Sequence, residues 1–387
     1  MMAILILLVL LILLFGGYTF RKDIFAPWNI TVSIWLFIIL SFQVVDTILY
    51  PLNDFFLTNI SLWISGFYFS SIFIFNITRS SPELKYTPSK KIVNLYFVLL
   101  LIFLPLYLYT TYENIQRGDG IVSLRNTAVS GSGYGALIYL WTLAKALFII
   151  CLVNNVFDSK YKFYTVIFIN LLFAFSIMEK GYLLFILISL IYVNYLNKKI
   201  SAFHIALSFS GFILFSVLLN IIRTVGFEGE IKDDSIFGFI NLYMLSPCIA
   251  FQTLESSVSP DVFGSHTLSF FYKIFNSIGL YTGEISNKLN EFVYIPIPTN
   301  VYTVMQPFYE DFNEVGVLIF GSITGGIAGF LYKKKLNNTV YTCIYTYFVY
   351  ILFMQFFQEE LFSSLSVFIQ IIIYCSLPMI VSKFRLK

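Results

Sequence analysis

Apolar segments long enough to cross a lipid bilayer recur along the whole of this 387-residue chain. A helix needs about 20 mostly apolar residues to cross the hydrocarbon core. Charged residues make up only 12% of the sequence, roughly half of the share typical of soluble domains. We therefore expect an all-α polytopic integral membrane protein with about eleven transmembrane helices (11–12), near residues 2–20, 28–50, 55–77, 92–112, 136–156, 162–178, 181–196, 203–222, 315–332, 340–358 and 361–382.

The positions of Lys and Arg predict the direction in which these helices cross the membrane. With the N-terminus placed outside, sixteen of the 24 Lys and Arg residues fall in connections on the inner side and seven on the outer side, while Lys145 lies within a span. Cytoplasmic connections of membrane proteins carry an excess of these residues. We therefore expect a periplasmic N-terminus and a cytoplasmic C-terminus.

The spacing of the spans divides the chain into three parts. Residues 1–222 hold the first eight helices, residues 223–314 form one large outer loop, and residues 315–387 hold the last three helices. An apolar run in the loop, interrupted at Pro247, is expected to lie in or dip into the outer interface, because a full crossing would place the basic C-terminus outside. A second dip near residues 268–282 would preserve the same topology.

Several function classes are disfavoured by the sequence. The four cysteines lack the spacing of metal ligands or of a disulfide framework, so neither a zinc site nor a disulfide framework is expected, and no cofactor is predicted. The formal net charge of +3 is small and scattered, so nucleic acid is not an expected partner. An internal repeat of the kind found in many transporters is not visible.

Four outer cations are candidates for binding phosphate groups, because Arg and Lys match phosphate oxygens. Arg117 and Arg125 lie in a glycine-rich segment, Lys180 lies in a very short turn after Glu179, and Arg223 opens the large loop. Ordinary alternatives are contacts with lipid headgroups for the first two, an ion pair at the hairpin tip for Lys180, and a favourable helix dipole for Arg223.

Three further outer residues are candidates for moving a proton. His266 is one of two histidines, and Glu310 and Asp311 precede the ninth predicted span. A carboxylate held there could take a proton from a sugar hydroxyl, although both acids could also serve as a cap at a helix N-terminus. Within the membrane, Lys145 is expected to pair with Asp46 or to act in the site.

Residues 296–329 resemble the C-terminal signature of O-antigen polymerases, the Wzy-type oligosaccharide repeat-unit polymerases. The matching residues are Pro298, Asn300 and Thr303, then Tyr309, Asp311 and Phe312, followed by Gly316, Gly325 and Gly326. Asn313 stands where the family usually has glycine, and asparagine also tolerates left-handed backbone geometry. The hairpin at residues 179–181, Arg223 and the single large loop late in the chain are similar to the family as well.

The resemblance implies an enzyme on the periplasmic face of the Gram-negative inner membrane. Such polymerases transfer a growing glycan from undecaprenyl diphosphate to the terminal sugar of a new lipid-linked repeat unit, without a metal. The resemblance assigns catalysis to Arg223, Asp311, Glu310 or His266, and binding of diphosphate or glycan to Arg117, Arg125, Lys180, Asn300 and Tyr309. A chain-length co-polymerase and a repeat-unit flippase are the protein partners that it implies.

Other membrane proteins share parts of this pattern. An O-antigen ligase has a similar layout and usually relies on a histidine in its large loop, which His266 could supply. A repeat-unit flippase handles the same lipid, but usually has twelve spans and short loops. A membrane acyltransferase is disfavoured because His204 lacks a neighbouring acidic partner.

Overall fold

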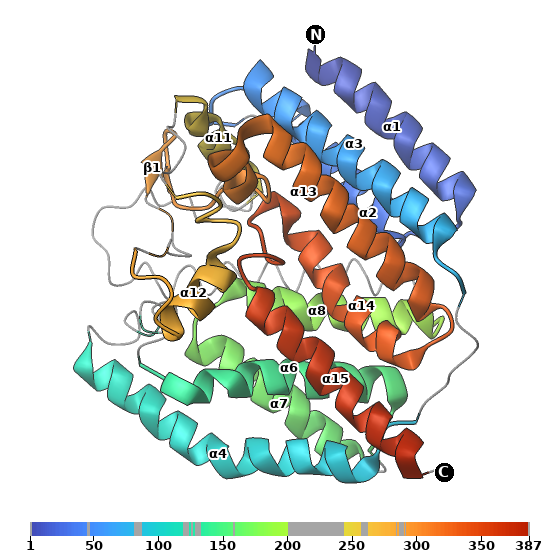
Figure 1. Ribbon diagram of the computed structural model, residues 1–387, viewed down its shortest axis with the longest axis vertical. Coiled ribbons are helices and arrows are strands. Elements are labelled where there is room, and N and C mark those ends of the chain that lie inside the picture. Colours follow the sequence, from blue (N-terminus) through green and yellow to red (C-terminus); the bar gives the residue numbers. More distant parts are fainter. Residues whose placement is uncertain are drawn as a thin grey trace. The chain divides into compact units, whose positions relative to one another are not determined.

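The computed structural model in Figure 1 describes residues 2–44, 47–80, 87–118, 124, 127, 133–157, 159–199, 244–256, 262–283, 285, 290 and 292–385. This part of the chain is almost entirely helical, with one two-stranded antiparallel sheet in which Val293 pairs with Thr299. The elements are α1 (Met2–Phe20), α2 (Pro27–Val44), α3 (Asp54–Ile77), α4 (Lys90–Arg117), η2 (Gly135–Ile138), α6 (Tyr139–Asn154), α7 (Lys160–Ser176), α8 (Lys180–Leu196), α11 (Ser246–Gln252), η4 (Thr253–Ser256), α12 (Ser269–Ser277), β1 (Val293–Tyr294), β2 (Pro298–Thr299), α13 (Gln306–Lys335), α14 (Thr339–Phe353), η5 (Met354–Phe356) and α15 (Leu365–Arg385).

The prediction of an all-α polytopic membrane protein is confirmed. Eight of the described helical segments are long and apolar enough to cross a membrane, and α8 is a shorter apolar helix. Ten of the eleven predicted spans coincide with described helices, whereas the span at residues 203–222 lies outside the described residues. The exact number of crossings stays a prediction.

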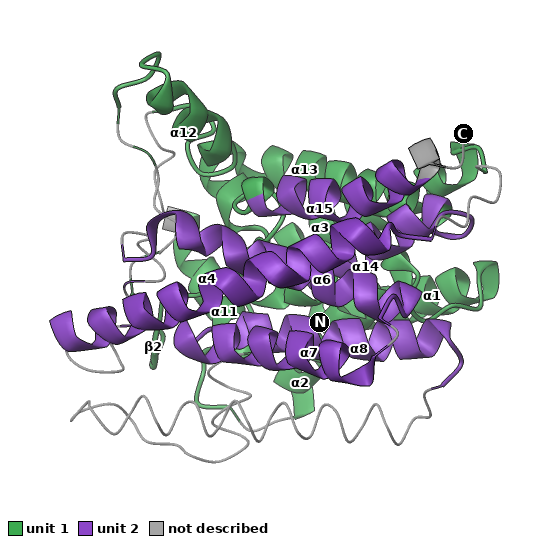
Figure 2. Ribbon diagram, turned by 90° about the horizontal axis from the view of Figure 1, so that it is seen from below, with its two compact units in different colours: residues 1–80, 231–333, 351–366 green, residues 81–230, 334–350, 367–387 purple. Residues whose placement is uncertain are grey.

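The described helices form two compact units, coloured separately in Figure 2. Unit 1 comprises residues 1–80, 231–333 and 351–366, and unit 2 comprises residues 81–230, 334–350 and 367–387. Each unit is therefore assembled from segments that are distant in sequence. The three parts expected from the sequence, residues 1–222, 223–314 and 315–387, are defined by their position relative to a bilayer. That division stays a prediction.

In unit 2, the charge of Lys145 lies against aromatic rings of α8. Its Nζ is 4.3 Å from the ring centre of Tyr182 and 5.6 Å from that of Phe185, distances typical of cation–π contacts. The Tyr182 hydroxyl is 2.9 Å from Oδ1 of Asn170 on α7. Asp46, the expected partner of Lys145, lies outside the described residues.

In unit 1, a buried glutamine links three segments. The Oε1 atom of Gln355 accepts hydrogen bonds from Nε1 of Trp35, at 3.3 Å, and of Trp63, at 3.1 Å, and its Nε2 donates to Oγ1 of Thr31 at 2.9 Å. The backbone carbonyl of Gln355 accepts from the N–H of Val304 at 2.9 Å. Because buried amides need such partners, this network fixes η5 against α2, α3 and the segment before α13.

Helices α3 and α13 of unit 1 approach each other closely enough for backbones to touch. Gly321, Gly325 and Gly329 recur every four residues on α13, which places them on one face. A Cβ atom at Gly325 would lie 2.3 Å from the carbonyl oxygen of Phe67, and one at Gly329 would lie 2.1 Å from that of Ser71. This face therefore has no space for a side chain.

We expect Gly329→Ala to lower the stability of unit 1, because the added methyl group meets the fixed backbone of α3. Overpacking of this kind typically costs about 1–3 kcal/mol. Gly326→Ala is the matched control, since its Cβ would meet only Cγ1 of Ile74, at 3.4 Å, and alanine is the better helix former. Thermal unfolding of the purified protein in detergent checks this: equal melting temperatures for the two variants would contradict the close contact.

Helix α13 begins at Gln306, nine residues before the predicted start of this span, and it is broken once. Asn313 has φ 53° and ψ −150°, close to a backbone region that is essentially restricted to glycine. The resemblance expects glycine here and left-handed geometry for the asparagine that replaces it; the φ of Asn313 is positive, but its ψ lies outside the left-handed helical region. The break sets the first two turns of α13 apart from the long apolar portion.

We expect Asn313→Gly to stabilise the protein, because glycine relieves a strain that typically costs about 1–3 kcal/mol. Asn313→Ala retains the strained Cβ and removes the polar side chain that tolerates such geometry, so it should not stabilise the protein. Melting temperatures of both variants in detergent provide the measurement. A lower melting temperature for the glycine variant would show that the strain at this position is small.

Candidate functional site

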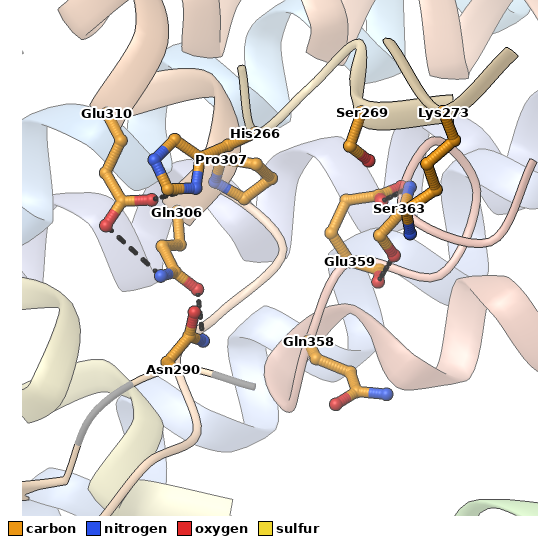
Figure 3. Close-up of a pocket in the computed structure, with 10 residues that line it drawn as sticks. All are labelled: His266, Ser269, Lys273, Asn290, Gln306, Pro307, Glu310, Gln358, Glu359 and Ser363. Atoms are coloured by element: carbon orange, nitrogen blue, oxygen red, sulfur yellow. Dashed lines mark hydrogen bonds and ion pairs between the residues drawn. The ribbon is translucent and has the colours of Figure 1, made fainter. Parts of the chain in front are cut away.

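Figure 3 shows a pocket in unit 1 at the N-terminal end of α13. The pocket is only partly enclosed, and the space of about 550 Å³ around its lining residues includes open solvent. The walls come from the turn before α12, from α12 itself, from the first turns of α13, from residue 290 and from the connection between η5 and α15. The ten lining residues are almost all polar: His266, Ser269, Lys273, Asn290, Gln306, Pro307, Glu310, Gln358, Glu359 and Ser363.

Two residues predicted from the sequence, Glu310 and His266, meet in this pocket. Oε2 of Glu310 lies 3.5 Å from Nδ1 of His266, and their side chains are 18% and 30% exposed. The other oxygen of Glu310 accepts a hydrogen bond of 3.2 Å from Nε2 of Gln306, whose Oε1 accepts one of 2.8 Å from Nδ2 of Asn290. These contacts orient the carboxylate toward the imidazole, as Figure 3 shows.

The adjacent carboxylate, Asp311, makes different contacts. Its two oxygens accept hydrogen bonds from the backbone N–H groups of His266, at 3.2 Å, and Thr267, at 2.6 Å. The Thr267 hydroxyl donates to the carbonyl oxygen of Pro307 at 3.0 Å. Asp311 therefore attaches the turn that carries His266 to the first turns of α13, and it is not among the residues that line the pocket.

The sequence interpretation assigned no role to Glu359, which lies in the connection before α15. Its carboxylate accepts hydrogen bonds from the backbone N–H groups of Leu361, Phe362 and Ser363, at 2.6, 2.8 and 2.6 Å. Burial raises the pKa of the Glu359 carboxyl above its usual range, and these hydrogen bonds act in the opposite direction. Because its oxygens accept these backbone hydrogen bonds, the carboxylate holds the turn that forms this wall of the pocket.

The sequence contained a pattern from which this side of the pocket could have been predicted. Gln358, Glu359 and Glu360 stand together at the boundary between two predicted spans, where a short connection needs no such polarity. Lys273, on α12, was also missed as a site residue. It is an isolated cation within an otherwise apolar and aromatic run.

The remaining predicted site residues lie elsewhere. The Tyr309 ring packs against Phe55 and Phe251, with ring centres 4.9 and 5.6 Å apart, so it contributes to the core. Asn300 follows β2 and does not line the pocket.

Two of the predicted cations, Arg117 and Lys180, are not among the pocket residues either. In unit 2, Arg117 forms an exposed ion pair of 3.1 Å with Glu113, and Lys180 begins α8. Arg125 and Arg223 lie outside the described residues. In the described part of the chain, no group of three or more His, Cys, Asp or Glu side chains is arranged to hold a metal ion.

We expect Asp311→Asn to loosen the turn that carries His266. An asparagine side chain has one acceptor oxygen, so one of the two backbone N–H groups loses its partner. Hydrogen exchange of the peptide around residues 262–268 should become faster, whereas the neighbouring substitution Glu310→Gln should leave it unchanged. Equal exchange in both variants would contradict the separate roles of the two carboxylates.

Comparison with known proteins gives one similarity over nearly the whole chain. No family model and no solved structure matches it. The chain is similar to a curated protein of Escherichia coli (strain K12) named "Putative O-antigen polymerase", with 27% identity over 386 residues and coverage of 96% of both chains. This similarity over nearly the full length agrees with the resemblance found at residues 296–329. The comparison therefore supports the resemblance of this chain to O-antigen polymerases.

Proposed function

We propose that this protein is an O-antigen polymerase that uses the pocket of unit 1 as its active site. It would transfer the growing glycan from undecaprenyl diphosphate to the terminal sugar of a new lipid-linked repeat unit. The observation that carries the proposal is the His266–Glu310 pair, which lines a polar pocket beside transmembrane helices. Glu310 also falls within residues 296–329, the segment that resembles the family signature.

The distribution of charge in unit 1 supports a periplasmic position for this pocket. Arg21 and Lys333 lie at the opposite end of α13, where both contact the ring of Phe75, at 5.4 and 4.5 Å from its centre. About twenty residues of helix separate this end from Asn313, a length of roughly 30 Å and therefore close to the thickness of the hydrocarbon core. If the basic end is cytoplasmic, the pocket opens on the periplasmic side of a multi-pass inner membrane protein.

The reaction requires a proton acceptor and a group that stabilises the leaving diphosphate. A hydroxyl of the acceptor sugar forms a bond to the anomeric carbon of the donor glycan, the bond from that carbon to the diphosphate breaks, and the hydroxyl proton passes to a base. We assign this proton to the His266 imidazole, because the Glu310 carboxylate 3.5 Å away stabilises the resulting imidazolium. Asp311 acts as a positioning residue for the same turn.

Cations would offset the negative charge that develops on the leaving diphosphate. Lys273 is the residue with a fixed positive charge among those that line the described pocket. Arg117, Arg125, Lys180 and Arg223 stay candidates for binding diphosphate, and Asn300 and Tyr309 for binding the glycan, as the family resemblance implies. The flippase and the chain-length co-polymerase are the partners that this function implies.

An O-antigen ligase is the second candidate function, and the specific observation that favours it is the histidine in the pocket. A ligase makes the same break at the lipid diphosphate, but its acceptor is the lipid A core. The pocket geometry is compatible with both acceptors, whereas the curated relative carries the polymerase name.

Deletion of the gene in its own host, followed by gel analysis of the lipopolysaccharide, tests this function. A polymerase deletion should leave lipid A core with a single repeat unit and no long ladder. Core without any repeat unit would exclude the polymerase; accumulation of the lipid-linked polymer outside would then identify a ligase, and accumulation of the single unit inside a flippase.

Complementation of this deletion tests the residues. We expect His266→Gln and Glu310→Gln to abolish the ladder, because either change removes the pair that accepts the proton. Glu314→Gln is the matched control, since Glu314 lies one helical turn beyond Glu310, is exposed and does not line the pocket. Arg223→Ala and Lys180→Ala test the cations, and full rescue by both would remove them from the site. Protein levels in the membrane fraction must be equal in all strains.

A further inference from the structure

Helix α12 (Ser269–Ser277) has an exposed apolar face. Phe271, Ile274, Phe275 and Ile278 follow the spacing i, i+3, i+4 and i+7, which places them on one side of a helix. Each of these side chains is at least 40% exposed. Leu280, Phe263 and Phe292, in the segments before and after α12, are exposed as well. The surface of a soluble protein rarely carries an apolar patch of this kind without a partner.

The opposite face of the same helix belongs to the pocket. Successive helical residues are about 100° apart, so Ser269 and Lys273 lie nearly opposite the centre of the apolar face. Both residues line the pocket together with His266 and Glu310. Helix α12 therefore separates the polar pocket from whatever covers its apolar side.

Hydrogen bonds attach α12 at its N-terminal end and terminate it at its C-terminal end. At the N-terminal end, the adjoining Thr267 is held by Asp311. At the C-terminal end, Gly279 has φ 76° and donates to the carbonyl of Asn276, and the N–H of Leu280 donates to that of Phe275. This pair of hydrogen bonds is the Schellman motif that ends many helices.

The length and composition of α12 indicate what covers the apolar face. Nine residues of helix measure roughly 14 Å, less than half of the hydrocarbon thickness, so α12 cannot span a bilayer. A short helix with Phe and Ile on one face and polar residues on the other is typical of helices that lie in the membrane interface. Unit 1 also contains helices that are long and apolar enough to cross a bilayer.

We propose that α12 lies in the plane of the membrane, with its apolar face immersed at the boundary between headgroups and acyl chains. The pocket behind α12 then opens at the depth of the lipid phosphates, with Lys273 on the pocket side. This placement depends on the structure of unit 1 and does not require the proposed activity. Combined with that activity, it gives a lipid-linked substrate a route into the pocket from the side of the bilayer.

Spin labels attached to single cysteines test the placement in protein reconstituted into liposomes of phosphatidylethanolamine and phosphatidylglycerol. The four native cysteines are buried, so a label attached to Ile274→Cys or Phe275→Cys reports on α12. Asn276→Cys is the matched control, since it is exposed on the other side of the helix and does not line the pocket. The protein without an introduced cysteine, treated with the same spin label, measures any background from the native thiols, and unchanged melting temperatures show that the variants fold.

We expect labels at 274 and 275 to collide severalfold more often with oxygen, which concentrates in lipid, than with a water-soluble nickel chelate. The label at 276 should show the reverse order. Preferential collision with the nickel chelate at 274 and 275 would show a water-exposed face and overturn the proposal. Exclusion of both reagents there would show that protein covers the face, and would overturn it equally. Neither measurement uses polymerase activity, so failure of the proposed function would leave this test intact.

Discussion

Contact between the backbones of α3 and α13 is the constraint on which the site of unit 1 depends. Glycines at every fourth position of α13 remove the side chains that would otherwise separate the two helices. Helices in a bilayer gain little from the hydrophobic effect when they associate, so close backbone packing supplies much of their attraction. Because α13 is fixed along this line, its basic end and its pocket end are held at opposite ends of a helix that is long enough to cross the hydrocarbon core.

The break at Asn313 separates the pocket-lining first turns of α13 from its long apolar portion. Consecutive helical residues point about 100° apart, so Glu310 and Asp311 face different surroundings although they are neighbours. Glu310 faces the pocket and His266, and Asp311 holds the backbone of the turn that carries His266. Asp311 thus holds the turn that carries His266, and the Glu310 carboxylate is left to face the pocket.

The sequence predicted features that depend on local composition, and it missed those that depend on tertiary packing. Hydrophobic length located ten helices that the structure describes, since crossing a bilayer imposes the same requirement on each segment. The start of α13 was placed too late because Glu310 and Asp311 made its first turns look like a loop. Glu359 and Lys273 were missed as site residues because they line the pocket only once α12, α13 and the connection before α15 come together. The packing of Tyr309 shows the same limit, because its position in the motif gave no indication that its ring lies against Phe55.

A membrane enzyme with a lipid-linked substrate must satisfy two opposed requirements. Ionised side chains such as Lys273 and Glu310 are costly within hydrocarbon, whereas the lipid anchor of a substrate is costly outside it. The boundary between headgroups and acyl chains is the depth at which both costs are small. A helix that is apolar on one side and lines a polar pocket on the other meets both requirements within the width of a single helix. The amphipathic pattern of α12 is therefore explained by the position of the pocket, and the same pattern is hard to explain if the helix faces water.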